Sequence, residues 1–247
     1  MTLRSSEDLE KLRAIGAIVR MSLEAMAEAA KPGMTTAELD AVCASVLAAH
    51  GAEGSPAKVY GFPGTACISV NDEAVHGIPG PRKLAEGDLV KCDVTAEKDG
   101  YVADSAITVR VGKVDRKADA LVRCAQSAFR QGMQAARPGN YVRDIGKAVE
   151  AEVRRWGFDV IRELCGHGVG SSIHEEPCVP NYCDPRSQDK LTEGLVITIE
   201  PIIAAGKGRV RVLPDKWTIR TRDRSLSAHY EHTLVVTKDG PLLVTAA

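Results

Sequence analysis

Aromatic residues are scarce in this chain, because three Phe, two Trp and five Tyr make up only 4% of its 247 residues. There is accordingly little aromatic surface on which nucleic-acid bases could stack. An excess of charge of one sign is also missing: 32 Lys and Arg face 33 Asp and Glu, and the net charge of -1 argues against a strongly basic nucleic-acid binder. The hydrophobic residues, 44% of the chain, must instead form a largely aliphatic core, which a chain of this length can bury.

Long hydrophobic runs are absent as well. The most apolar stretch, residues 195–205, is interrupted by Glu200 and is too short to span a bilayer. The first seven residues lack an apolar segment behind a basic start, so no secretory signal is predicted. The seven cysteines are odd in number and have no Cys-x-x-Cys spacing, which favours reduced thiols, with Cys67, Cys92 and Cys165 as small buried residues. These absences predict a soluble cytoplasmic protein that makes no membrane contact.

Hydrophobic periodicity, by contrast, is clear along much of the chain. The helical period predicts helices over residues 6–30, 36–50, 118–136 and 141–156. Thr35 and Glu38 have the spacing of a capping box at the start of the second helix. Strand patterns cover residues 66–70, 89–97, 101–111, 195–203 and 230–237. The Lys98-Asp99-Gly100 segment is typical of a hairpin turn between two of these strands.

Short sequences of the first half recur in the second. Ala-Ala-Lys-Pro-Gly at 29–33 returns as Ala-Ala-Arg-Pro-Gly at 135–139, an offset of 106 residues. Leu-Ala-Glu-Gly at 84–87 returns as Leu-Thr-Glu-Gly at 191–194, an offset of 107 residues. Matches in the same order at a nearly constant offset predict an internal duplication.

The duplication also predicts the fold class. We expect an α+β protein with two pseudo-symmetric halves, in which helices cover a curved, mostly antiparallel sheet. No linker rich in Ser, Gly or Pro separates the halves. The chain is therefore expected to form a single domain over residues 1–247, with halves of roughly 1–112 and 113–247.

Each half carries two carboxylates in strands that otherwise read as apolar. Asp93 and Glu200 stand six residues after the repeated glycine of their half, and the next strand of each half contributes Asp104 or Glu231. A buried carboxylate without a partner costs several kcal/mol or becomes protonated. Four acids that meet near the axis between the halves would repel one another without a cation. They therefore predict a pair of divalent metal ions.

One histidine fits this site as its nitrogen ligand. His167 lies in Cys-Gly-His-Gly-Val-Gly, where the glycines leave the imidazole uncrowded. Taken singly, Asp93 or Asp104 also fits an ordinary surface or salt-bridged acid, and His167 also fits a turn residue. His50 and His229 carry no signal of a functional role.

These residues and their surroundings resemble the type I methionine aminopeptidases. The resemblance also rests on His76 before Gly-Ile-Pro, on His174 before Glu-Glu-Pro and on the Tyr-Glu-His-Thr motif at 230–233, and it extends to Thr237. It implies the pita-bread fold and two divalent ions per chain, either Co, Mn, Fe or Zn. The ions would be held by Asp93, Asp104, His167, Glu200 and Glu231. The family's type II branch has an insertion for which the spacing of these ligands leaves little room.

The resemblance further implies an activity and its partners. The substrate would be a nascent polypeptide at the ribosome, and its N-terminal Met would be removed when the second residue is small. Glu200 would accept and pass on the proton of the attacking water, while His76 and His174 would hydrogen-bond the peptide and the developing oxyanion. The enzyme would be a cytoplasmic monomer without nucleic-acid specificity.

The pocket for the Met side chain is where this chain departs from the usual pattern of the family. The corresponding positions here are Val59, Phe62, Cys67, Ile173 and Trp217. Aromatic residues are common in the family at the positions of Val59 and Ile173, and Tyr60 replaces a frequent His. An aliphatic wall can still hold a flexible thioether, so the departure concerns the shape and tolerance of the pocket.

Two other functions fit parts of the pattern. Prolidases and proline-directed aminopeptidases resemble the chain in the same five ligands but usually carry a further N-terminal domain, whereas about 65 residues precede the first predicted strand here. A pita-bread binding module that has lost catalysis would be expected to lack one or more ligand positions, and all five are present.

Overall fold

The computed structural model describes residues 1–246. Its helices are α1 (Ser6–Ala29), α2 (Thr36–Ala49), α3 (Ser55–Tyr60), α4 (Arg116–Ala135) and α5 (Val142–Arg155). Its strands are β1 (Glu53–Gly54), β2 (Cys67–Val70), β3 (Glu73–Val75), β4 (Leu89–Lys98), β5 (Tyr101–Arg110), β6 (Asp159–Val160), β7 (Cys165–Gly168), β8 (Glu175–Pro180), β9 (Val196–Ile199), β10 (Ile202–Ala204), β11 (Val210–Val212), β12 (Ile219–Thr221), β13 (Ser227–His229), β14 (Glu231–Val235) and β15 (Leu242–Leu243). The four long helices agree with the predicted ones to within two residues at each end.

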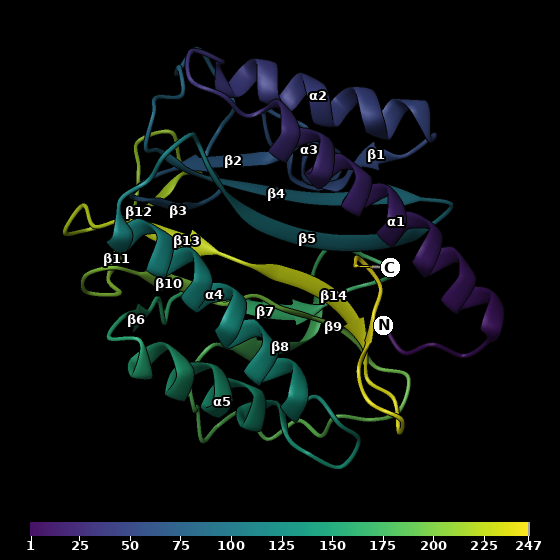
Figure 1. Ribbon diagram of the computed structural model, residues 1–247. Helices are drawn as coiled ribbons and strands as arrows, with labels where there is room; N and C mark the ends of the chain where they lie inside the picture. Colours follow the sequence, from purple (N-terminus) through teal and green to yellow (C-terminus); the bar gives the residue numbers. More distant parts are fainter. Residues whose placement is uncertain (247) are drawn as a thin grey trace.

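A nine-stranded sheet forms the centre of the molecule. Its main path is β1-β4-β5-β14-β9-β7-β8, with β2 paired to β4 and β15 paired to β14, and every pairing is antiparallel. In Figure 1 the α1–α2 pair lies at the top and the α4–α5 pair at the bottom, with β4, β5 and β14 between them. Strand β14 thus joins strands of the first half to strands of the second.

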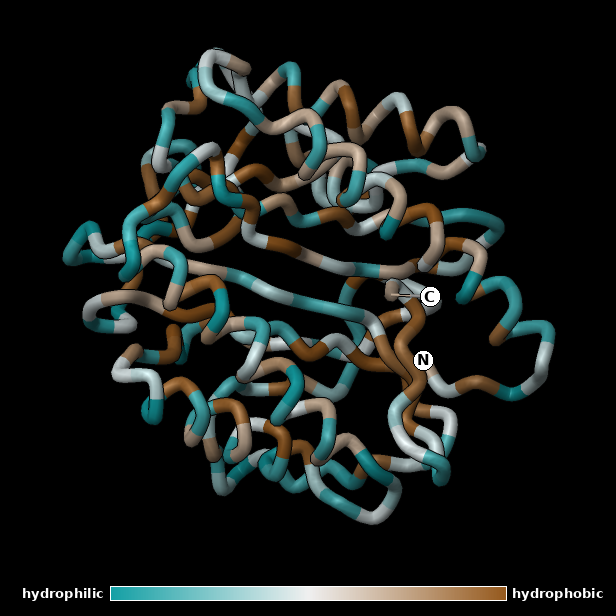
Figure 2. Tube along the Cα trace, viewed as in Figure 1, coloured by the Kyte–Doolittle hydropathy of each residue, from teal (hydrophilic) through white to brown (hydrophobic). Residues whose placement is uncertain are grey.

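Each helix pair has its own hydrophobic core. One core combines α1 and α2 with β2 and β4, and the other combines α4 and α5 with β9 and β14. The colours of Figure 2 alternate along the helices, since one face of each packs inward and the other faces water. Among residues 1–246, no helix is both long enough and apolar enough to cross a membrane.

Helix and turn signals in the sequence are confirmed locally. The capping box of Thr35 and Glu38 is present, because each side chain accepts from the other residue's backbone N–H group. Strands β4 and β5 form a hairpin in which Lys98 pairs with Tyr101, and Asp99 and Gly100 both have positive φ. This is the backbone that a tight two-residue hairpin loop requires.

Two of the predicted strands differ from those in the structure. The segment 195–203 is broken after Ile199, so that β9 belongs to the large sheet and β10 to a small sheet with β13 and β6. Pro201 explains the break, because proline has no N–H group to donate to a ladder. The predicted strand 230–237 corresponds to β14, and a further strand that was not predicted, β13, ends just before Tyr230. The chain therefore passes from one sheet to the other at Glu200 and again just before Glu231.

Candidate metal centre and substrate pocket

Strands β4, β5 and β14 lie side by side in the sheet and place two acids and an alanine at paired positions. Asp93 on β4 pairs with Ala106 on β5, and Ala106 pairs on its other side with Glu231 on β14. Asp104 lies two residues before Ala106 and therefore points to the same face. The methyl group of Ala106 leaves room above the sheet, so the three carboxylates can converge there.

Glu200 reaches the same place from the end of β9. Its side chain and that of Glu231 are buried, with 10% and 2% exposure. Thr198 orients it, because the Thr198 hydroxyl donates to Glu200 Oε1 over 3.0 Å and accepts from the backbone N–H of His167. Thr198 was not among the predicted site residues, and its only signal is its position two residues before Glu200 on one strand face.

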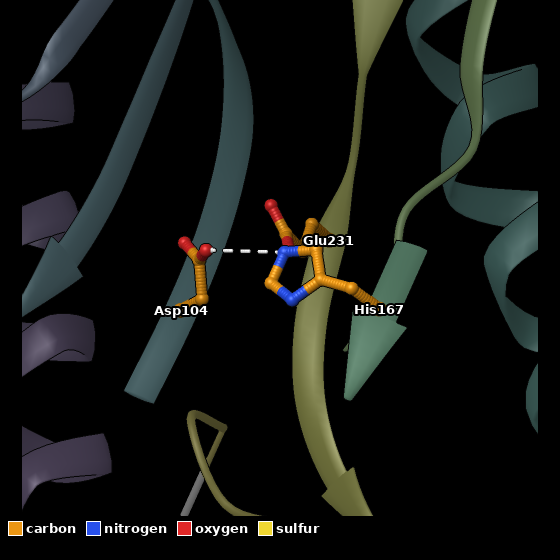
Figure 3. A group of neighbouring side chains, drawn as sticks. All are labelled: Asp104, His167 and Glu231. Atoms are coloured by element: carbon orange, nitrogen blue, oxygen red, sulfur yellow. Dashed lines mark ion pairs between the residues drawn. The ribbon is translucent and has the colours of Figure 1, made fainter. Parts of the chain in front are cut away.

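The imidazole of His167 faces these carboxylates from β7 (Figure 3). Its Nε2 atom lies 3.7 Å from Asp104 Oδ2 and 3.6 Å from Glu200 Oε1. Its Nδ1 atom lies 2.9 Å from the carbonyl oxygen of Gly168. A proton on Nδ1 donates to that carbonyl and leaves the Nε2 lone pair free to bind a cation.

The electrostatics of the cluster favour a cation. Burial, reinforced by the neighbouring acids, raises the pKa values of Asp93, Glu200 and Glu231 well above their ordinary range, and burial raises the pKa of Asp104 to about 6. Asp104 Oδ1 and Glu231 Oε1 are buried and have no hydrogen-bond partner in the part of the chain that the structure describes. A divalent ion would satisfy these oxygens and stabilise the ionised acids, so the residues present fit a metal site.

Two groups of ligand atoms are compact enough to surround an ion. One consists of Asp104, His167 and Glu231, and the other of Glu200, His229 and Glu231; within each group the ligand atoms lie within 4.8 Å of one another. The expectation that His229 has no functional signal is corrected here. It ends β13, two residues before Glu231, and its Nε2 atom lies 3.3 Å from Glu231 Oε2. Its place two residues before a ligand in a strand pattern could have identified it.

A cavity of about 450 Å³ opens beside the acids. Among the residues expected in the Met pocket, Phe62, Cys67, Ile173 and Trp217 line it. Phe62 and Trp217 meet edge to face with ring centroids 5.2 Å apart. Val59 is not brought into this wall, since it is 54% exposed at the surface of α3, and Tyr60 lines the cavity beside it.

His76 and His174 also line the cavity. Burial lowers the pKa of His76 to about 4, with repulsion from His174 as a further cause, so its ring is neutral near pH 7. Burial likewise lowers the pKa of His174, whose Nδ1 atom lies 2.7 Å from the Tyr60 hydroxyl. His76 has a φ of 57°, and the following Gly77 has no space for a side chain, because a Cβ there would lie 2.2 Å from the Ile68 carbonyl oxygen.

Two cysteines lie close together on the β7–β8 hairpin, near the cavity. Cys165 is partly buried rather than buried as expected, and Cys178 is exposed. Their Sγ atoms lie 2.7 Å apart, and Cys165 is one of the residues that line the cavity.

Comparison with known proteins agrees with this arrangement. Residues 10–238 match the model of metallopeptidase family M24. The chain is 42% identical to methionine aminopeptidase 2 of Bacillus subtilis over 99% of both sequences. The crystal structure of methionine aminopeptidase from Rickettsia prowazekii superposes with a TM-score of 0.95 at 36% identity, covering 99% of this chain and 100% of that one.

A prolidase from Pyrococcus furiosus shares the fold at lower similarity. Its TM-score is 0.81 at 23% identity, and the match covers all of this chain but 66% of the prolidase. The architecture common to these proteins is the α+β pita-bread fold predicted from the sequence. The chain therefore belongs to metallopeptidase family M24, a family of metal-dependent hydrolases, and within it to the type I methionine aminopeptidases.

Proposed function

We propose that this chain removes the N-terminal methionine from nascent polypeptides whose second residue is small. The observation that carries the proposal is the cluster of buried acids and His167 at the wall of a cavity with an apolar side. A peptide that enters this cavity can place its first side chain among aliphatic and aromatic groups while its first peptide bond reaches the acids.

Asp93, Asp104, His167, Glu200 and Glu231 would hold two divalent ions, either Co, Mn, Fe or Zn. When bound, such ions supply Lewis-acid polarisation of the scissile carbonyl and a water of lowered pKa. Carboxylate oxygens and one or two imidazoles suit borderline divalent ions, and the residue types do not select one of the four.

Glu200 is the proposed proton carrier. It accepts the proton of the attacking water and passes it to the leaving amine, because its carboxylate lies among the proposed ligands at the wall of the cavity. The hydroxyl of Thr198, which donates to Oε1, fixes the orientation of the carboxylate for both transfers.

His174 and His76 act on the peptide rather than on the ions. If the Tyr60 hydroxyl donates to Nδ1 of His174, the proton of the neutral ring is on Nε2, where it can donate to the developing oxyanion. His76, also neutral, is a second donor to the substrate backbone. In that arrangement Tyr60 sets the tautomer of His174.

The walls of the cavity set which residue is removed. Phe62, Cys67, Ile173 and Trp217 form an apolar surface suited to an unbranched thioether. We expect the protein to act as a monomer in the cytoplasm, on chains that emerge from the ribosome, because those are the polypeptides that begin with methionine.

Release of free methionine from Met-Ala-Ser tests the function directly. The protein is stripped of metal and assayed without oxygen, alone and with Co(II), Mn(II), Fe(II) or Zn(II). Met-Leu-Ser tests the requirement for a small second residue, and an Xaa-Pro dipeptide tests the prolidase alternative. Metal-dependent cleavage of Met-Ala-Ser alone is expected. Cleavage of Xaa-Pro in preference, or no cleavage with any ion, would contradict the proposal.

A further inference from the structure

His229 is held rigidly at the edge of the metal centre. It is 1% exposed, and its backbone pairs with Ile202 of β10. The Thr108 hydroxyl accepts from the His229 backbone N–H over 2.9 Å and donates to its carbonyl oxygen over 2.8 Å. Strands on both sides therefore fix the backbone from which the imidazole extends.

The imidazole itself has no hydrogen-bond partner. Neither Nδ1 nor Nε2 forms a hydrogen bond with any residue between 1 and 246, although the side chain is fully enclosed. Buried polar groups without partners are rare in folded proteins, and each calls for a ligand or ion to satisfy it. The groups nearest to Nε2 are two carboxylates: Oε2 of Glu231 at 3.3 Å and Oε2 of Glu200 at 3.9 Å.

The 3.3 Å between His229 Nε2 and Glu231 Oε2 matches the separation of two ligands of one ion, whereas the 3.9 Å to Glu200 Oε2 is longer. Two ligand atoms that each lie about 2.1 Å from a tetrahedral or octahedral ion are roughly 3 to 3.5 Å apart. Glu200 turns Oε1 toward His167, at 3.6 Å, and Oε2 toward His229. The carboxylate thus stands between two imidazoles, and each of its oxygens faces a different one.

We propose that His229 is a metal ligand, and that Glu200, His229 and Glu231 bind one ion through Nε2 and carboxylate oxygens. Asp93, Asp104 and His167 would complete the centre, in which His229 would be a sixth ligand beside the five already named. The inference deepens the proposed function, on which it rests for the presence of the ions. A second imidazole favours Co(II), Fe(II) or Zn(II) over harder ions, because nitrogen is a softer ligand than carboxylate oxygen.

X-ray absorption spectroscopy of the Zn(II)-loaded full chain tests the assignment. In the unsubstituted protein we expect scattering from two imidazoles for every two ions. In His229→Gln, whose amide side chain fills much of the space of the imidazole, we expect scattering from one. His232→Gln is the matched control. His232 is also a buried imidazole of this segment, but it has Tyr230 and Thr245 as partners, so its loss should leave two imidazoles.

The imidazole count of the unsubstituted protein tests whether His229 binds an ion even if a variant fails to fold. One imidazole per two ions would overturn the assignment and leave His229 as a hydrogen-bond donor to the two glutamates. An unchanged imidazole count in folded His229→Gln would overturn it as well. The spectrum is recorded without turnover, so a protein that releases methionine but shows one imidazole refutes this inference and not the proposed function.

Discussion

The rings of His167 and His174 pack edge to face, with centroids 4.4 Å apart and planes inclined by 66°. One ring faces the acids, whereas the other has its Nδ1 atom at the Tyr60 hydroxyl. A proposed metal ligand and a proposed substrate contact are therefore in direct contact, and the two roles can be separated by substitution.

Glu200→Ala and His174→Ala should both lose activity, by different routes. Loss of the Glu200 carboxylate removes a ligand and the proton carrier, so metal and turnover are both lost. Loss of the His174 imidazole should leave the metal in place and lower kcat by about 100-fold or more, as expected for an oxyanion donor. Metal content by atomic emission and the rate of methionine release distinguish the two. A metal-free His174→Ala protein would count against this division of roles.

Ala106→Val should damage the metal centre by crowding it. Ala106 is buried in the row between Asp93 and Glu231, so two added methyl groups enter the space in which the carboxylates meet. Ala103→Val is the matched control, because Ala103 is equally buried but on the opposite face of β5. Both variants should lose about 1–3 kcal/mol of unfolding free energy to overpacking. Only Ala106→Val should bind Zn(II) more weakly in calorimetric titration; equal Zn(II) affinities would refute the effect.

Metal removal should destabilise the fold, and a charge-removing substitution should compensate for it. Without an ion, burial and then repulsion between the acids disfavour the charged carboxylates, as their raised pKa values reflect. Glu231→Gln should therefore raise the thermal midpoint of the chelator-treated protein while weakening its response to added Zn(II). We expect the substitution to increase the unfolding free energy of the metal-free protein by about 1–2 kcal/mol, the free energy that corresponds to a pKa shift of about one unit. Thermal denaturation with EDTA and with Zn(II) measures both effects. A lower midpoint for Glu231→Gln in EDTA would contradict the repulsion.

Glu152 should make the stability of the α4–α5 pair depend on acid pH. Its carboxylate accepts from the side chains of Arg155, Ser127 and Trp156, and the bond to Arg155 is the main cause that lowers its pKa to about 2. Because the folded-state pKa lies below the unfolded one, the stabilisation is complete above about pH 4.5 and is lost as the pH falls toward 2.

Glu152→Ala should accordingly cost about 2 kcal/mol at pH 7 and have a smaller effect at pH 3. Urea unfolding at both pH values measures this difference. Glu28→Ala, at an exposed position of α1, serves as the control and should change stability little at either pH. An equal cost of Glu152→Ala at pH 7 and pH 3 would show that the carboxylate charge is not the source of its stabilisation.

Sequence patterns predicted that the acids converge, but they did not predict every residue and strand that surrounds them. Asp93 and Glu200 stand out because a carboxylate is costly in an apolar strand, and this local signal needs no structure. The break at Glu200 was signalled only by Pro201, and the sheet that receives the chain after it depends on distant pairing with β13. Val59 was assigned to the pocket by its place in the sequence, but α3 turns it to the surface. For His229 the only local signal was its place two residues before Glu231, and its approach to Glu200 depends on the pairing of β13 with β10.

Strand β14 lies between β5 and β9 in the sheet, although most of the chain precedes it in the sequence. During ribosomal synthesis, Asp93 and Asp104 emerge long before Glu231, and both helix pairs are complete while the two halves still have no strand to join them. Glu231 belongs to both groups of ligand atoms. The full set of ligands therefore exists only after residues 231–235 have paired, so a chain truncated before them should bind metal more weakly.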